Sequence, residues 1–89
     1  MNISSLVIYA QPQRANDVRA ELEQLSGVEV HAVTAEGRIV VTVEKRDDRE
    51  MAQAFEQMSV IPGVQATTLV YSHSETFEGE SPAKKESNR

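Results

Sequence analysis

The sequence predicts an α+β sandwich with the element order βαββαβ, in which two helices cover one face of a four-stranded antiparallel sheet. Residues 37–44 (Gly-Arg-Ile-Val-Val-Thr-Val-Glu) combine a turn glycine with β-branched residues, which is typical of a central strand. The flanking pattern occurs twice, because residues 22–26 (Leu-Glu-Gln-Leu-Ser) are echoed by residues 55–59 (Phe-Glu-Gln-Met-Ser). In both copies a Gly-Val pair and a further strand pattern follow, at Gly27 and Gly63. Two such copies indicate a split βαβ sandwich.

Composition narrows the class of protein. The chain has 89 residues, enough for one small domain. Its net charge of -5 and pI near 4.9 argue against a nucleic-acid partner, which would call for a basic stripe. The absence of cysteine excludes disulfides and thiol nucleophiles. No apolar run approaches the ~20 residues of a membrane span and no export signal is visible, so we expect no membrane insertion and a cytoplasmic location.

The first half of the chain divides into a strand, a helix and a second strand. We expect a strand over residues 5–10, with Pro12 in the first turn of the helix that follows. Gly27 is the expected residue after that helix, and a strand over residues 28–34 then leads through Glu36-Gly37 to the central strand. The apolar stripe that predicts the helix consists of Ala15, Val18, Leu22 and Leu25.

The second half repeats the unit and then changes character. Asp47 is expected to cap the second helix, with Glu50 completing a capping box. Pro62-Gly63 predicts a turn before a strand over residues 64–71. The polar composition after this strand predicts one domain over residues 1–73 and a disordered tail over residues 74–89. The buried stripe of the second helix consists of Met51, Ala54, Phe55 and Met58.

Alternation along the strands assigns side chains to two faces. The face turned toward the helices is expected to carry Leu6, Ile8, Val28, Val30, Ile39, Val41, Val43, Val64, Ala66 and Val70. The opposite face is expected to carry Ser5, Val7, Tyr9, His31, Val33, Val40, Thr42, Thr67, Leu69 and Tyr71. An apolar centre with a polar rim, on a face without helices, indicates a docking surface. β-propensity alone, packing of the tail through Phe77, or a homodimer are alternative explanations.

The residues that commonly carry catalysis are not grouped in this sequence. His31 and His73 have no ligand pattern around them and are interpreted as surface histidines. No serine stands in a nucleophile motif, and the glycines lack the spacing of a phosphate-binding loop. Tyr9 on an acidic protein does not make an RNA-binding platform. We therefore predict a protein that is not an enzyme and has no cofactor or metal.

Four segments, taken in order, resemble the NapD family: residues 5–8 (Ser-Leu-Val-Ile), 37–44, 62–64 (Pro-Gly-Val) and 68–73 (Thr-Leu-Val-Tyr-Ser-His). The resemblance covers about residues 3 to 73. It implies a ferredoxin-like fold and a cytoplasmic chaperone of the periplasmic nitrate reductase catalytic subunit. Such a chaperone binds the twin-arginine signal peptide of the precursor and delays export until the cofactors are installed.

Combined with the face assignment, this resemblance yields a set of candidate peptide-binding residues and an expected monomer or weak dimer. Whether the peptide binds as a helix or as an added strand stays open. The alternative is an ACT-like regulatory module that binds a small ligand, although the loop at residues 11–14 lacks the glycine that such a module calls for. The candidates are Val7, Tyr9, Val40, Thr42, Leu69 and Tyr71 on the face, with the carboxylates of Glu29 and Glu44 as partners for the arginines.

Overall fold

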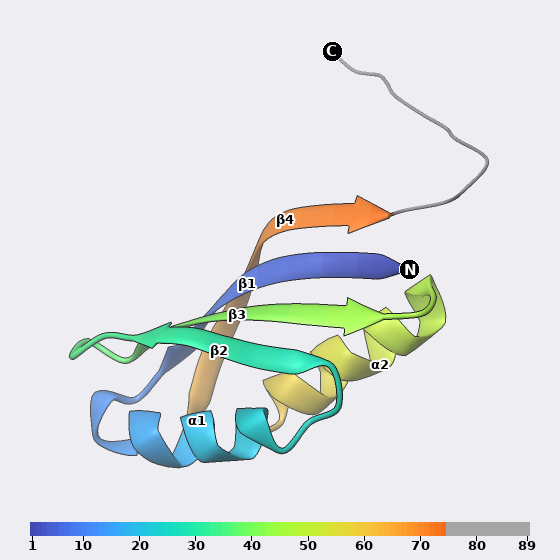
Figure 1. Cartoon of the computed structure of the whole chain (residues 1–89). Coiled ribbons are helices and arrows are strands. Elements are labelled where there is room, and N and C mark those ends of the chain that lie inside the picture. The colour runs from blue at the N-terminus through green and yellow to red at the C-terminus, as the bar shows by residue number, and fades with distance from the viewer. Residues whose placement is uncertain (75–89) are drawn as a thin grey trace.

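The computed structural model describes residues 1–74 and confirms the predicted fold, a ferredoxin-like sandwich with one antiparallel sheet (Figure 1). The sheet has four strands in the spatial order β2-β3-β1-β4, so β1 and β3 are central and β2 and β4 are the edges. The predicted tail at residues 74–89 lies outside the described residues except for Ser74. The elements are β1 (Asn2–Ala10), a 3-10 turn (Pro12–Arg14), α1 (Ala15–Glu23), β2 (Val28–Val33), β3 (Arg38–Lys45), α2 (Asp48–Ser59) and β4 (Val64–Ser74).

Both helices lie on the same side of the sheet and leave its other side uncovered (Figure 1). The core fills the space between the helices and the inner face of the sheet, and burial of its apolar surface is the main stabilising term. Half-buried Leu25, Val28, Val30, Val33, Phe55 and Val64 pack around its edge. The buried core consists of Leu6, Ile8, Ala10, Val18, Leu22, Ile39, Val41, Val43, Met51, Ala54, Met58 and Ile61.

The two central strands pair without interruption, and this regularity fixes which of their side chains face outward. The antiparallel register runs from Asn2 opposite Lys45 to Tyr9 opposite Arg38. Along β1, buried and half-buried residues alternate strictly. The predicted faces of β1 and β3 are therefore confirmed, with every second residue in the core and the intervening ones on the uncovered side.

A bulge in β2 overturns the predicted face of Val33. Val30 pairs with Val41, but Ala32 pairs with Val40, so one extra residue is accommodated at His31. The extra residue reverses the alternation beyond it. Val33 consequently lies opposite Ile39 and packs against the core, instead of facing outward as predicted.

Two irregularities in β4 overturn more of the predicted faces. The register between β4 and β1 shifts between Ser5 and Leu6, where Val70 has no cross-strand partner on β1. It shifts again between Tyr9 and Ala10. Between the two shifts, each side chain of β4 therefore faces the side opposite to the one predicted. The strand also bends strongly along its length (Figure 1). Leu69 and Thr67 lie opposite Leu6 and Ile8, which places them on the helix side, where the prediction was wrong. Ala66 and Thr68 lie on the uncovered side, opposite Tyr9 and Val7.

The helix α1 ends earlier than the position of Gly27 in the sequence predicted. Its last residue is Glu23, and Gln24 is the C-cap, so Gly27 is not the residue that terminates it. Gly27 instead has a φ of 78° in the turn that leads to β2. Its carbonyl accepts a hydrogen bond from the Glu44 amide at 2.9 Å, and a Cβ built on Gly27 would stand 2.3 Å from the Glu44 carbonyl oxygen. Glycine is required there for close approach of the two segments as well as for backbone conformation.

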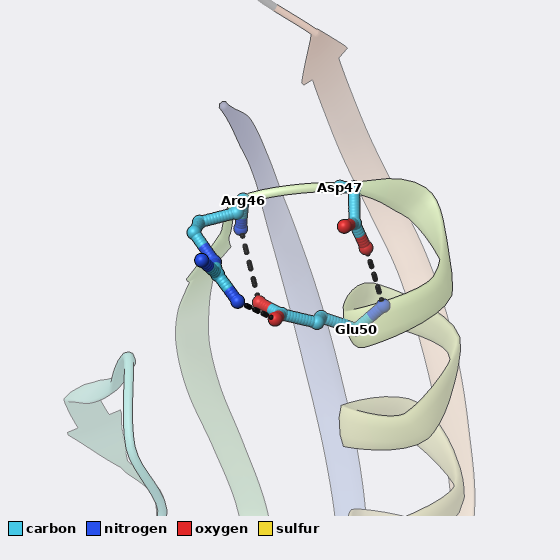
Figure 2. A network of polar contacts seen from close by, with 3 residues as sticks. All are labelled: Arg46, Asp47 and Glu50. Carbon is cyan, nitrogen blue, oxygen red and sulfur yellow. Dashed lines mark hydrogen bonds and ion pairs between the residues drawn. The ribbon is translucent and has the colours of Figure 1, made fainter.

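The second helix begins at the predicted cap. The Asp47 carboxylate accepts a hydrogen bond from the Glu50 amide at 2.9 Å, as predicted (Figure 2). The Glu50 carboxylate does not return this bond to the Asp47 amide. It accepts from the backbone amide of Arg46 at 3.4 Å and from the Arg46 guanidinium at 2.6 Å. The capping box is therefore displaced by one residue, and it is closed by an ion pair.

This ion pair predicts a pH effect on stability. The hydrogen bond from the Arg46 side chain lowers the pKa of the Glu50 carboxyl below its ordinary value. The unfolded chain therefore binds this proton at higher pH than the folded chain, so the stabilisation is complete above the unfolded pKa and is lost as pH falls through the folded one. Glu50→Gln should be less stable than the wild type at neutral pH, and the difference should shrink on acidification. Urea unfolding of both proteins across acidic pH measures it, and a pH-independent difference would contradict the assignment.

Candidate binding face

The uncovered side of the sheet is the candidate site, and we call it the open face. The cross-strand register arranges its side chains in rows that run across the strands. One row joins Ala32, Val40, Val7 and Thr68. The whole open face consists of Ile3, Ser5, Val7, Tyr9, Glu29, His31, Ala32, Arg38, Val40, Thr42, Glu44, Ala66, Thr68, Tyr71 and His73.

The centre of the open face is apolar. Val7 and Val40 are directly opposed on the two central strands, and Val40 is 36% exposed. The neighbouring row contains Ser5 opposite Thr42, both half-buried. Small hydroxyl side chains leave the two valines accessible from above, so the centre offers a shallow apolar strip to a ligand.

Aromatic and imidazole rings flank the apolar centre. The Arg38 guanidinium lies over the Tyr9 ring, 5.8 Å from its centroid. On the β2 side, His31 Nε2 and Thr42 Oγ1 are 2.8 Å apart, a hydrogen bond whose direction depends on the imidazole tautomer. On β4, the rings of Tyr71 and His73 stack with centroids 6.3 Å apart. These contacts hold both edges of the face in defined conformations.

Two carboxylates stand at one end of the open face. Glu29 lies opposite Thr42, and Glu44 lies two positions further along β3, opposite Ile3. Residues in this diagonal relation have Cα atoms about 7–8 Å apart, so a single cationic group can reach both carboxylates. The two residues predicted as arginine partners are thus brought together by the sheet, on the predicted face.

The predicted site residues are brought together with one exception. Val7, Tyr9, Val40 and Thr42 occupy the two central strands, and Tyr71 lies opposite Ser5 at the β4 edge. Leu69 does not belong to the set, because its register places it on the helix side, where it is 52% exposed.

Six members of the face were not assigned to it from the sequence: Ile3, Ala32, Arg38, Ala66, Thr68 and His73. Ile3 was excluded by starting the first strand too late, Arg38 and His73 were assigned to neither face, and Ala66 was assigned to the helix side. Thr68 and Ala32 were displaced by the bulges in β4 and β2. Ile3 stands an even number of positions before Ser5, Val7 and Tyr9, so an earlier start of the strand would have placed it on the same face.

A second depression lies away from the open face. A groove of about 490 Å³ runs between α1 and the free edge of β2. Arg19 and Glu23 line it and form an ion pair with each other at 3.5 Å, both partly exposed. Their charges compensate one another, so this groove has no marked net charge.

The described part of the chain, residues 1–74, contains no group of three or more potential metal ligands. Within the same residues, no helix is long and apolar enough to cross a bilayer. The open face offers apolar contact, hydroxyl groups and charged ends to a ligand. This arrangement is typical of a binding surface.

The family model described as "NapD protein" matches residues 1–76. Chaperone NapD of Escherichia coli K12 is 34% identical over 79 residues, covering 88% of this chain and 90% of that protein. Chaperone NapD of Paracoccus pantotrophus is 37% identical over 71 residues, covering 80% and 62%. The solution structure of the E. coli Tat proofreading chaperone NapD superposes with a TM-score of 0.74 at 32% identity, covering 93% of this chain and 87% of that one. This chain belongs to the NapD family of chaperones.

Proposed function

We propose that this protein binds the twin-arginine signal peptide of the periplasmic nitrate reductase catalytic subunit precursor. By binding the signal peptide in the cytoplasm, the protein holds back export of the precursor until cofactor insertion is complete. The observation that carries the proposal is the apolar pair Val7 and Val40 at the centre of a face that no helix covers. The choice of ligand is supported by the relationship to the E. coli Tat proofreading chaperone NapD.

The apolar centre and the charged end match the two parts of a twin-arginine peptide. The apolar segment of the peptide would pack on the strip around Val7 and Val40, and its arginines would reach Glu29 and Glu44. Exposed ion pairs are each worth about 0–1 kcal/mol. Burying ~400 Å² of apolar surface would contribute on the order of 10 kcal/mol before the costs of association. Apolar contact should therefore dominate affinity, whereas charge should govern association rate and selectivity.

Calorimetric titration of a synthetic twin-arginine peptide at low and high salt tests the proposal. We expect affinity to fall only a few-fold with salt, because exposed ion pairs contribute little and are screened. Replacing the apolar segment of the peptide by polar residues should weaken binding at least ~100-fold, since the main driving term is removed.

Three other outcomes of this titration would contradict the proposal. Binding that salt alone abolishes would show that charge, not the apolar strip, is the site. Absence of binding at either salt concentration would refute peptide recognition. Binding of a free amino acid in place of the peptide would favour a small-ligand regulatory module.

A further inference from the structure

The acidic and basic side chains of the open face lie at opposite ends of it. Glu29 and Glu44 stand together at one end, and Arg38 stands at the other, with the apolar strip between them. Arg38 and Glu44 are six positions apart on β3, which is about 20 Å at the rise of a strand. The face therefore has a negative end and a positive end along the strand direction.

The Arg38 side chain is held on the open face by a contact with Tyr9. Its guanidinium lies over the Tyr9 ring, and Tyr9 is its cross-strand partner on β1. Glu36 stands two residues earlier in the β2–β3 turn, beyond the last row of the face. No ion pair between Glu36 and Arg38 occurs in residues 1–74 as the structure describes them. Stacking on Tyr9 directs this cation toward a bound ligand rather than toward the turn.

We infer that the open face determines the direction in which its peptide lies, with the arginines at Glu29 and Glu44 and with Arg38 excluding the reverse orientation. The inference rests on the proposed function, because it concerns the same face and the same ligand. In the forward orientation two attractive contacts form. In the reverse orientation both are lost and the peptide arginines meet Arg38. Exposed charges at this spacing should bias the two orientations by roughly tenfold or more.

The distance between the two ends suits the ligand. An extended segment of about six residues spans ~20 Å, and a helical one needs about thirteen. Val7 and Val40 lie between the two ends, so an apolar segment that follows the arginines would cover them in either conformation. Arg38 is in this sense a specificity-determining residue, since it contributes little attraction to the apolar segment and acts mainly against a misplaced cation.

Paramagnetic relaxation with a spin-labelled peptide tests the direction. The probe is a synthetic peptide with Arg-Arg near its N-terminus followed by an apolar segment, carrying a nitroxide at one terminus or the other. We expect the N-terminal label to broaden amide signals of Ile3 and Glu44, and the C-terminal label to broaden those of Tyr9 and Arg38. Reversed broadening, or equal broadening of both ends by each label, would overturn the inference while leaving peptide binding intact.

Charge variants then test the role of Arg38. With Arg38→Glu, the N-terminal label should broaden both ends, because both now attract arginine. Glu36→Gln is the matched control in the adjacent turn and should keep the wild-type pattern. Dispersed amide spectra verify folding, and Arg38→Ala replaces Arg38→Glu if that variant unfolds, with a partial loss of direction expected. An unchanged pattern in folded Arg38 variants would overturn the inference, and failure of the wild type to bind the peptide would refute the proposed function with it.

Discussion

Val40→Glu is expected to weaken signal-peptide binding at least ~100-fold while the fold stays intact. Val40 is at the centre of the open face, opposite Val7. A carboxylate there would have to be desolvated beneath the apolar segment of the peptide, which costs several kcal/mol unless it is paired. In the free protein the same carboxylate is accessible to water, so folding should be little affected. Calorimetric titration and circular dichroism of the variant measure the two effects.

Val60→Glu provides the matched control. Val60 is also an exposed valine, at 74%, but it follows α2 and lies outside the open face. The same change there should leave peptide affinity within about twofold of the wild type. Equal losses in both variants would mean that net charge, and not the open face, controls binding. Unfolding of Val40→Glu would mean that Val40 is a core residue, contrary to its register.

Leu22→Ala is expected to lower the free energy of unfolding by about 2–5 kcal/mol. Leu22 is fully buried on α1 at 0% exposure, and it belongs to the core between helix and sheet. Truncation removes buried apolar surface and leaves a cavity that the packed neighbours fill only in part. For a domain whose total stability is about 5–15 kcal/mol, this is a large fraction. Urea denaturation followed by circular dichroism measures it.

Leu69→Ala is the control of identical chemistry on the edge strand. Leu69 is half-exposed on β4, so its truncation should cost less than about 1 kcal/mol. It should also leave peptide affinity unchanged, since its register places it on the helix side. A clear loss of affinity in this variant would restore Leu69 to the binding set and would contradict the face assignment made from the register.

The faces of the central strands could be predicted from sequence because nothing interrupts them. β1 and β3 pair continuously from Asn2 to Tyr9, so the rule of alternation holds for their whole length. Val7, Tyr9, Val40 and Thr42 were therefore assigned correctly to the uncovered side. The two helices were predictable for a related reason, since apolar stripes such as Val18 and Leu22 follow the helical period and face the core.

The faces of the edge strands could be predicted only in part, because bulges reset the alternation. Edge strands tolerate an extra residue, and bulges there also block pairing with other chains. Neither the shift at His31 nor the one at Val70 is marked by a glycine or proline, so the local sequence signals neither bulge. Val33 and Leu69 were misassigned for this reason. Arg38 was missed because its role depends on Tyr9, which is distant in sequence.

Methyl NMR of valine-labelled protein titrated with the twin-arginine peptide tests whether the peptide binds on the open face. Val40 and Val41 are adjacent on β3 but point to opposite sides, and Val43 shares the core side with Val41. We expect large methyl shifts and contacts with the peptide at Val7 and Val40, with the methyls of Val41 and Val43 nearly unchanged. Contacts confined to valines beside the α1–β2 groove, such as Val30 and Val33, would contradict it.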